Sequence, residues 1–377
     1  MDKPGDSVFL DSESVHASAR PGNYPRVEID SSPLYELLLT LLVFTYEVNA
    51  YSFRVGPEWF EGVRARASSE LLAAYRDLSP GCWLWERLLV LACKWRSRSL
   101  LVNAGPFIER LQELDAQRLY EFLLGHDNGS SAIDGGVIEE AAAGNHDARL
   151  KLGKVLFPDE PEHDGTLALF LRRRPAEAKE TLLRIITGWY TELFRAEERE
   201  LAVRLATEAR TKRIIGSSAP SRLLRASTIG LQYFPRRSVS RVLLVPAIVT
   251  SPCVITIRFG ATRAFFYPLA DEPNDNDELS SRLVKIHRAL ADLERLHILQ
   301  ALIRSERTLP SLSRELGQHH MRLSAQLVIL RDAGLVTLRM DERRQTFAIR
   351  PNLPSVVFRT MQAFLPDVPG PGEPRPR

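Results

Sequence analysis

Hydrophobic residues recur at helical spacing through the first half of the chain. After the capping pair Ser32-Pro33, leucines 34, 37, 38, 41 and 42 repeat at intervals of three and four residues. Pro57, Asp115 and Pro175 mark the starts of further helices, and the helical texture continues to Gly216. We therefore expect a helical N-terminal domain over residues 27–237.

The pattern changes to that of β-strands from residue 238 to 268. Residues 242–245 form a short run of valine and leucine, as in a strand that is buried on both faces. Residues 254–259 and 263–267 flank a Gly260-Ala261-Thr262 turn, which predicts a hairpin. We expect a small β element over 238–270, followed by an acidic linker over 271–280.

Three helices and a charged hairpin follow over residues 281–365. In the first helix, Leu293, Leu296 and Ile303, with Leu299 one turn off, predict an apolar stripe. The second, 311–316, closes at Gly317, and the third carries Leu323, Leu327 and Leu330 on one face before Gly334 ends it. Residues 335–339 and 345–349 are strand-like. This order predicts a winged helix-turn-helix, and the fold class is mainly α with small β.

The composition of the two ends, the longest apolar run and the cysteines indicate which parts are disordered and where in the cell the protein is expected. Residues 1–26 are rich in Asp, Ser, Pro and Gly and predict a disordered lead-in, and the Pro- and Gly-rich residues 366–377 predict a disordered tail. The longest apolar run, 37–51, is interrupted by polar residues and falls short of the ~20 residues that span a bilayer. The three cysteines, Cys82, Cys93 and Cys253, form no Cys-x-x-Cys pair. We expect a cytoplasmic protein without membrane segments.

Positive charge is concentrated near the C-terminus. The net charge of the 377 residues is only +3, yet residues 285–350 hold 12 Lys/Arg against 7 Asp/Glu. A local surplus of this kind is typical of a surface that contacts nucleic acid.

The C-terminal pattern resembles the ArsR-type family of winged-helix regulators. The residues that carry the resemblance are Ala291-Asp292-x-x-Arg295 with Ile298-Leu299, Leu312-x-x-Glu315-Leu316-Gly317, and Leu323-Ser324-x-x-Leu327-x-x-Leu330-Arg331-x-Ala333-Gly334-Leu335-Val336. Less specifically, Val27-Glu28-Ile29-x-x-Ser32-Pro33-x-x-Glu36-Leu37 and the 238–268 segment look like the N-terminal extension of long family members. The resemblance implies a DNA-binding transcription regulator, more specifically a repressor. The alternative is a winged-helix module for protein interactions that binds no DNA.

If this domain binds DNA, we expect the outward face of the third helix to lie in the major groove and the wing to contact phosphates or the neighbouring minor groove. The candidate DNA-contacting residues are His320, Met321, Arg322, Ser324, Ala325, Arg339, Arg343 and Arg344. Two positions depart from the family pattern: His319 stands where a capping Ser is usual, and Ala325 where His is frequent.

Assembly is predicted from the last helix, which holds more apolar surface than one winged domain covers. The resemblance implies that this helix packs against the first helix of a second copy, giving a two-fold homodimer on a palindromic operator. The candidate dimerisation residues are Leu283, Ile286, Val357, Phe358, Met361 and Phe364.

We expect no metal and no cofactor. Family members that sense metals use a cysteine-rich motif before the recognition helix or acid and His ligands on the last helix, and the sequence has neither. No P-loop, dinucleotide-binding or hydrolase motif is present, so an enzyme is not expected. The five tryptophans, all between residues 59 and 189, favour core packing, with the wall of a small-molecule effector site in the N-terminal domain as the alternative.

Overall fold

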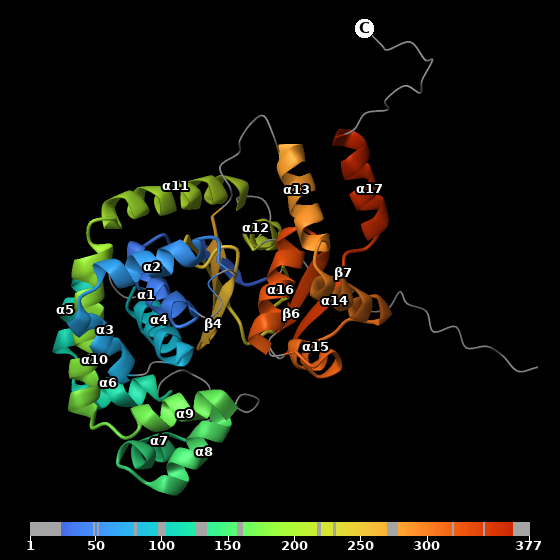
Figure 1. Cartoon of the computed structure of the whole chain (residues 1–377). Helices are drawn as coiled ribbons and strands as arrows, with labels where there is room; N and C mark the ends of the chain where they lie inside the picture. Colours follow the sequence, from blue (N-terminus) through green and yellow to red (C-terminus); the bar gives the residue numbers. More distant parts are fainter. Residues whose placement is uncertain are drawn as a thin grey trace, which may run out of the picture.

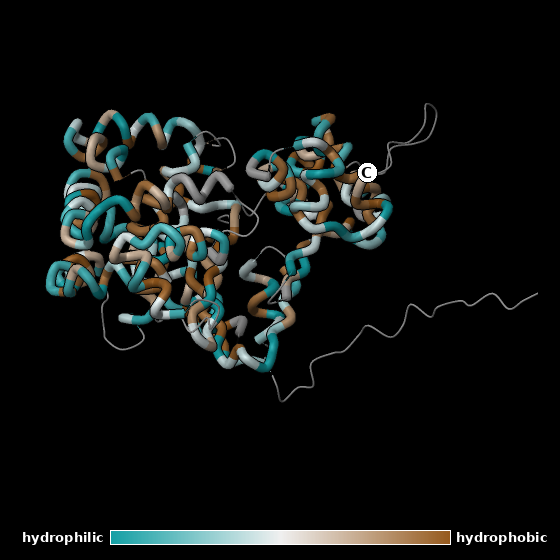
Figure 2. Tube along the Cα trace, turned by 90° about the horizontal axis from the view of Figure 1, so that it is seen from below, coloured by the Kyte–Doolittle hydropathy of each residue, from teal (hydrophilic) through white to brown (hydrophobic). Residues whose placement is uncertain are grey.

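The computed structural model describes residues 24–47, 50, 53–78, 81–96, 103–125, 134–156, 161–216, 220–228, 231–269, 278–318, 320–341 and 344–364. It forms a larger, mostly helical lobe and a smaller lobe that carries the C-terminal helices (Figures 1 and 2). The expected class, mainly α with small β and a C-terminal winged helix, is confirmed. No helix among these residues is long and apolar enough to cross a membrane.

The larger lobe is built from short helices. They are α1 (Pro33–Phe44), α2 (Gly56–Arg66), α3 (Ser69–Leu78), α4 (Cys82–Arg96), α5 (Ala104–Glu113), α6 (Ala116–Leu123), α7 (Gly135–Ala142), α8 (His146–Leu156), α9 (Pro161–Phe170), α10 (Pro175–Trp189), the π-helical turn η2 (Tyr190–Phe194) and α11 (Glu198–Gly216). The next helix, α12 (Pro220–Ser227), packs its Leu223 and Leu224 into the core of the smaller lobe. The expected caps are present: Ser32 Oγ accepts from Leu34 N, and Asp115 accepts from Arg118 N. α1 is buried almost all round, so it is the centre of this lobe.

A four-stranded sheet lies between the two lobes. Its order is β1 (Arg26–Ile29), β3 (Arg241–Ala247), β5 (Thr262–Pro268) and β4 (Ile255–Phe259). β4 and β5 form the expected antiparallel hairpin, whereas β1 and β5 pair with β3 in parallel. The strand β1 was not expected, because a four-residue segment that pairs with a strand more than 200 residues away leaves little local signal.

Each face of this sheet belongs to a different hydrophobic core. Leu243, Val245 and Phe266 pack with the helical lobe, whereas Leu244 and Phe265 pack with the C-terminal lobe. Because side chains alternate across a strand, both faces of β3 are apolar, which explains the unbroken 242–245 run. The sheet thus joins the lobes through a shared layer.

The smaller lobe contains the C-terminal elements. They are α13 (Glu278–Leu290), α14 (Leu293–Arg304), α15 (Leu309–Leu316), α16 (His320–Asp332), β6 (Val336–Asp341), β7 (Gln345–Ile349) and α17 (Leu353–Phe364). A third strand, β2 (Gln232–Phe234), pairs in parallel with β6 and extends the wing sheet. α13 begins inside the segment 271–280 that was expected as a linker, of which residues 271–277 lie outside the described part. The predicted lead-in 1–26, apart from 24–26, and the predicted tail also lie outside it.

The expected apolar stripe on α14 was wrong. Leu293, Leu296 and Ile303 are 69%, 38% and 71% exposed. Of the predicted residues only Leu299 is buried, on a face that it shares with Ile298, Ala301 and Leu302. This helix has apolar residues on both sides, so periodicity alone did not identify the side that packs.

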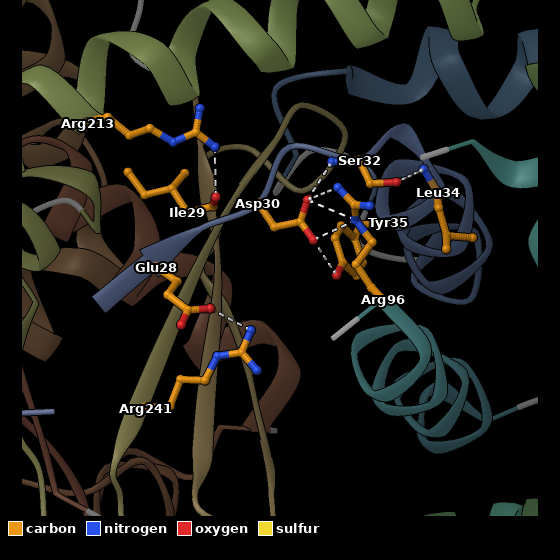
Figure 3. A network of polar contacts seen from close by, with 9 residues as sticks. All are labelled: Glu28, Ile29, Asp30, Ser32, Leu34, Tyr35, Arg96, Arg213 and Arg241. Carbon is orange, nitrogen blue, oxygen red and sulfur yellow. Dashed lines mark hydrogen bonds and ion pairs between the residues drawn. The ribbon is translucent and has the colours of Figure 1, made fainter. Parts of the chain in front are cut away.

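A polar network attaches β1 to the helical lobe (Figure 3). Arg96 of α4 donates to Asp30 at 2.9 Å, and the Tyr35 hydroxyl donates to the same carboxylate at 3.0 Å. Beside it, Arg241 pairs with Glu28 at 2.7 Å, and Arg213 of α11 donates to the Ile29 carbonyl at 2.8 Å. The acidic residues Glu28 and Asp30, in the segment that resembles the extension of long family members, therefore form ion pairs within the fold.

Candidate nucleic-acid interface

The helix-turn-helix is set up by local capping. Asp292 begins α14 by accepting from Arg295 N at 3.1 Å, and Thr308 begins α15 by accepting from Ser311 N at 3.3 Å. Gly317 ends α15 with φ of +63°, a conformation that favours glycine. The short link that follows turns the chain into α16, which occupies the position of a recognition helix.

The three helices share one core. Leu312 of α15 and Leu323, Leu327 and Leu330 of α16 are at most 1% exposed. The leucines of α16 are spaced i, i+4 and i+7, so they form a single inward stripe, as predicted. Gly334, with φ of +70°, ends the helix and leads the chain into the wing.

The wing is a sheet held from both sides. β6 and β7 pair from Val336↔Ile349 to Met340↔Gln345. On the outer side of β7, Arg307 and Phe347 exchange backbone hydrogen bonds of 3.0 and 2.7 Å. With β2 pairing with β6 on the other side, both edges of the β6–β7 hairpin have backbone partners.

The candidate DNA-contacting arginines differ in their engagement. Arg322 is exposed and forms a bidentate pair with Glu294 of α14, with Nε 3.0 Å from Oε2. Arg339 pairs with Glu306 at 2.8 Å and lies over the ring of Phe234 at 5.5 Å. Arg344 is exposed near the wing tip. The side chains of His320 and Met321, and the whole of Arg343, lie outside the described part of the chain.

The two remaining candidates do not face open solvent. Ser324 and Ala325 are half-buried and line a cavity between α16 and the helical lobe. From residue 323 to 333, every residue of α16 and its C-terminal turn is at least partly covered. In this arrangement, the helical lobe stands across the cavity from Ser324 and Ala325, where a DNA major groove would have to lie.

The candidate dimerisation residues divide into three groups by exposure. Phe358, Met361 and Phe364 of α17 are 64%, 36% and 43% exposed, and α17 stands beside α13 at the top of the smaller lobe (Figure 1). Leu283 and Val357 are half-buried. Ile286, expected at the dimer surface, is only 1% exposed because it packs inside the winged-helix core.

Three of the five tryptophans, and Cys93, lie in the interior of the helical lobe. Trp83, Trp85 and Trp189 are at most 5% exposed and belong to the hydrophobic core. Cys93 is fully buried, which raises the pKa of its thiol. Within the described residues, no group of three or more His, Cys, Asp or Glu is arranged to hold a metal ion.

The sequence missed two groups that act on this interface. Glu294, which pairs with Arg322, lies on a different helix, and no spacing rule connects the two. Arg331 lies seven residues after Ser324, so the helical period places it on the same face. That spacing is the signal in the sequence that connects Arg331 with Ser324.

Comparison with known proteins agrees with this geometry. The family model for the bacterial regulatory protein, arsR family, matches residues 292–337, which run from the cap of α14 into β6. No curated protein matches the chain. The C-terminal lobe therefore contains a helix-turn-helix of the arsR family, a type that points to a DNA-binding transcription regulator.

Proposed function

We propose that this protein is a cytoplasmic transcriptional repressor that binds a palindromic operator as a homodimer. The observation that carries the proposal is the complete winged helix-turn-helix over α14, α15, α16, β6 and β7, of which the arsR-family match covers α14 to the start of β6. α16 would enter the major groove, with Arg322 at its start, while the exposed Arg344 of the wing would contact phosphate.

The apolar residues of α17 support the homodimer. Phe358, Met361 and Phe364 expose a hydrophobic face at the end of the lobe, and soluble proteins usually bury such a face against a partner. A second copy related by a two-fold axis would cover it and place two recognition helices about 34 Å apart, one turn of DNA. That symmetry is the reason to expect a palindromic operator.

One observation favours a second candidate, a winged helix that serves protein contacts. The outward face of α16 lies against the protein's own helical lobe, with Leu42 and Phe53 across a cavity from Ala325. For DNA to bind, α16 must separate from this surface. A module that contacts only proteins would need no such movement.

Binding to duplex DNA over a salt series separates the two candidates. We expect the full-length protein to bind a random duplex at low salt, with an affinity that falls steeply as salt rises, because Lys and Arg displace counterions from phosphates. Selection of bound genomic fragments should then yield palindromic sites that compete far better than the random duplex. An affinity that does not depend on salt would contradict DNA binding and favour the protein-contact module. The same conclusion would follow if no binding occurred at about 50 mM salt, where electrostatic binding is strong.

A further inference from the structure

A cavity separates the recognition helix from the helical lobe. Its volume is about 220 Å³, and its lining is mainly apolar. Ser324, Ala325 and Val328 of α16 form one wall, and Leu42, Tyr46 and Phe53 form the opposite wall. The cavity is smaller than the ~300–1,000 Å³ of sites for drug-sized ligands, so it suits a compact molecule.

Arg331 brings a charge into this apolar cavity. The residue lines the cavity, is only 6% exposed, and its Nε and Nη2 atoms are buried without a hydrogen-bond partner in the described part of the chain. Burial disfavours the charged guanidinium and lowers the pKa of Arg331. Leaving a buried cation unpaired is costly, so such a group is normally matched by an anion.

No neighbouring group places an anion in hydrogen-bond contact with Arg331 Nε or Nη2 in the described part of the chain. Asp332, the next residue, attracts the guanidinium through space, but its carboxylate lies 3.5 Å from Lys285 and accepts no hydrogen bond from these two atoms. Cys253 also lines the cavity, but burial raises the pKa of its thiol to about 11, so it carries no charge at neutral pH.

We propose that this cavity binds a small organic carboxylate with an apolar body, whose carboxylate pairs with Arg331. The planar guanidinium presents N–H donors in a fork that matches the two oxygens of a carboxylate. Tyr46, Phe53 and Val328 provide the apolar surface for the rest of the molecule. An uncharged carbonyl group accepts hydrogen bonds from the guanidinium but leaves its charge unmatched, and a cation is repelled by it.

The position of the cavity gives the ligand a regulatory effect, and this step rests on the proposed DNA-binding function. A ligand in contact with both walls holds α16 against the helical lobe, whereas DNA requires the same face of α16 to be free. The two states compete, so the carboxylate lowers the affinity for DNA and DNA lowers the affinity for the carboxylate. The ligand would act as an inducer of the repressor.

Calorimetry on the full-length protein without DNA tests the site directly. The probes are phenylacetate and hexanoate, with phenylacetamide and hexylamine as uncharged and cationic analogues of similar shape. We expect the carboxylates to bind and the analogues to bind at least about tenfold more weakly, since a hydrogen bond to a charged group contributes roughly 1.5–3 kcal/mol. Absence of carboxylate binding at millimolar concentration, or equal binding of phenylacetamide, would overturn the proposal.

Variants of Arg331 show whether this residue is the anion partner. Arg331→Met should abolish the preference for carboxylate over amide, whereas Arg314→Met, an exposed arginine on α15, should retain it. Arg331→Met should also fold, because an apolar side chain replaces an unpaired buried charge, and its unfolding temperature should equal or exceed that of the wild type. Should the Met variant be unfolded, Arg331→Lys replaces it: loss of the fork should weaken carboxylate binding, and unchanged binding would overturn the assignment.

Adding phenylacetate to a DNA titration tests the coupling separately. We expect wild-type protein to bind DNA more weakly with the carboxylate present, and Arg331→Met to be insensitive to it. Carboxylate binding that leaves DNA affinity unchanged contradicts the coupling, although the site itself stands. A protein that binds carboxylate but never DNA refutes the proposed function and leaves the carboxylate site intact.

Discussion

Glu294 on α14 holds Arg322, the first outward-facing arginine of α16, with Arg322 Nε 3.0 Å from Glu294 Oε2. Arg322 is exposed, whereas residues 323–332 of α16 are buried or half-buried. The candidate residue best placed to contact DNA is thus already paired with a carboxylate. Any phosphate or guanine must compete with Glu294 for the same guanidinium.

This pair leads to a first prediction. Glu294→Gln should tighten binding to duplex DNA by about threefold and steepen the salt dependence by about one unit, because it frees one cationic contact and removes a negative charge. Fluorescence anisotropy over a salt series measures both quantities. The matched control is Glu180→Gln, an equal charge change on α10, for which we expect no effect. Unchanged or weaker DNA binding by Glu294→Gln would show that the pair orders Arg322 for DNA rather than restraining it.

The wing provides a second prediction. Replacing Arg343 and Arg344 together with Ala should weaken binding to all duplex sequences alike and lower the salt slope by roughly one to two units, close to one per lost phosphate contact. Anisotropy with one operator duplex and one random duplex makes the comparison. A loss confined to the operator would mean that the wing reads bases.

The third prediction concerns assembly. Phe358→Asp should yield monomers that bind the operator weakly, because a charge in the exposed apolar face of α17 prevents a second copy from covering it. Sedimentation at micromolar concentration gives the oligomeric state, and circular dichroism confirms that the domain is folded. Leu150→Asp on α8, where Leu150 is 46% exposed, is the control that should change neither property. Wild-type protein that sediments as a monomer yet binds its operator tightly would refute the dimer.

The fourth prediction follows from Glu36, which is buried beneath the end of β3. Its carboxylate accepts from Ile248 N at 3.0 Å and from Val249 N at 2.6 Å, yet burial outweighs these bonds and raises its pKa from 4.5 to about 7. The folded protein therefore holds a proton that the unfolded chain releases. This contribution is fully present below pH 4.5 and is lost as the pH rises through about 7.

The wild type should consequently lose stability relative to Glu36→Gln between about pH 5 and pH 8, by on the order of 3 kcal/mol. Urea unfolding followed by tryptophan fluorescence at the two pH values gives the difference. Glu109→Gln, which changes an exposed carboxylate on α5, should follow the wild type in parallel. A wild-type-minus-Gln difference that does not vary with pH would show that Glu36 is ionised throughout.

Local physical chemistry determined much of this protein from its sequence alone. The caps at Ser32 and Asp115, the left-handed turns at Gly317 and Gly334, and the leucine stripe of α16 each depend on residues a few positions apart, and each is present. The hairpin of β4 and β5 is local in the same sense. These signals were enough to identify the winged helix and its arsR-type pattern.

Only the tertiary structure decided which surfaces meet. α14 has apolar residues on two sides, and contact with the winged-helix core selected Ile298 and Leu302 rather than Leu293 and Ile303. β1 and β2 are short and pair with distant strands, so their sequences hold no local sign of their partners. The tertiary structure also decided what the outward face of α16 contacts. Whether its side chains meet DNA, solvent or the helical lobe depends on the position of Leu42 and Phe53, more than 260 residues earlier in the chain.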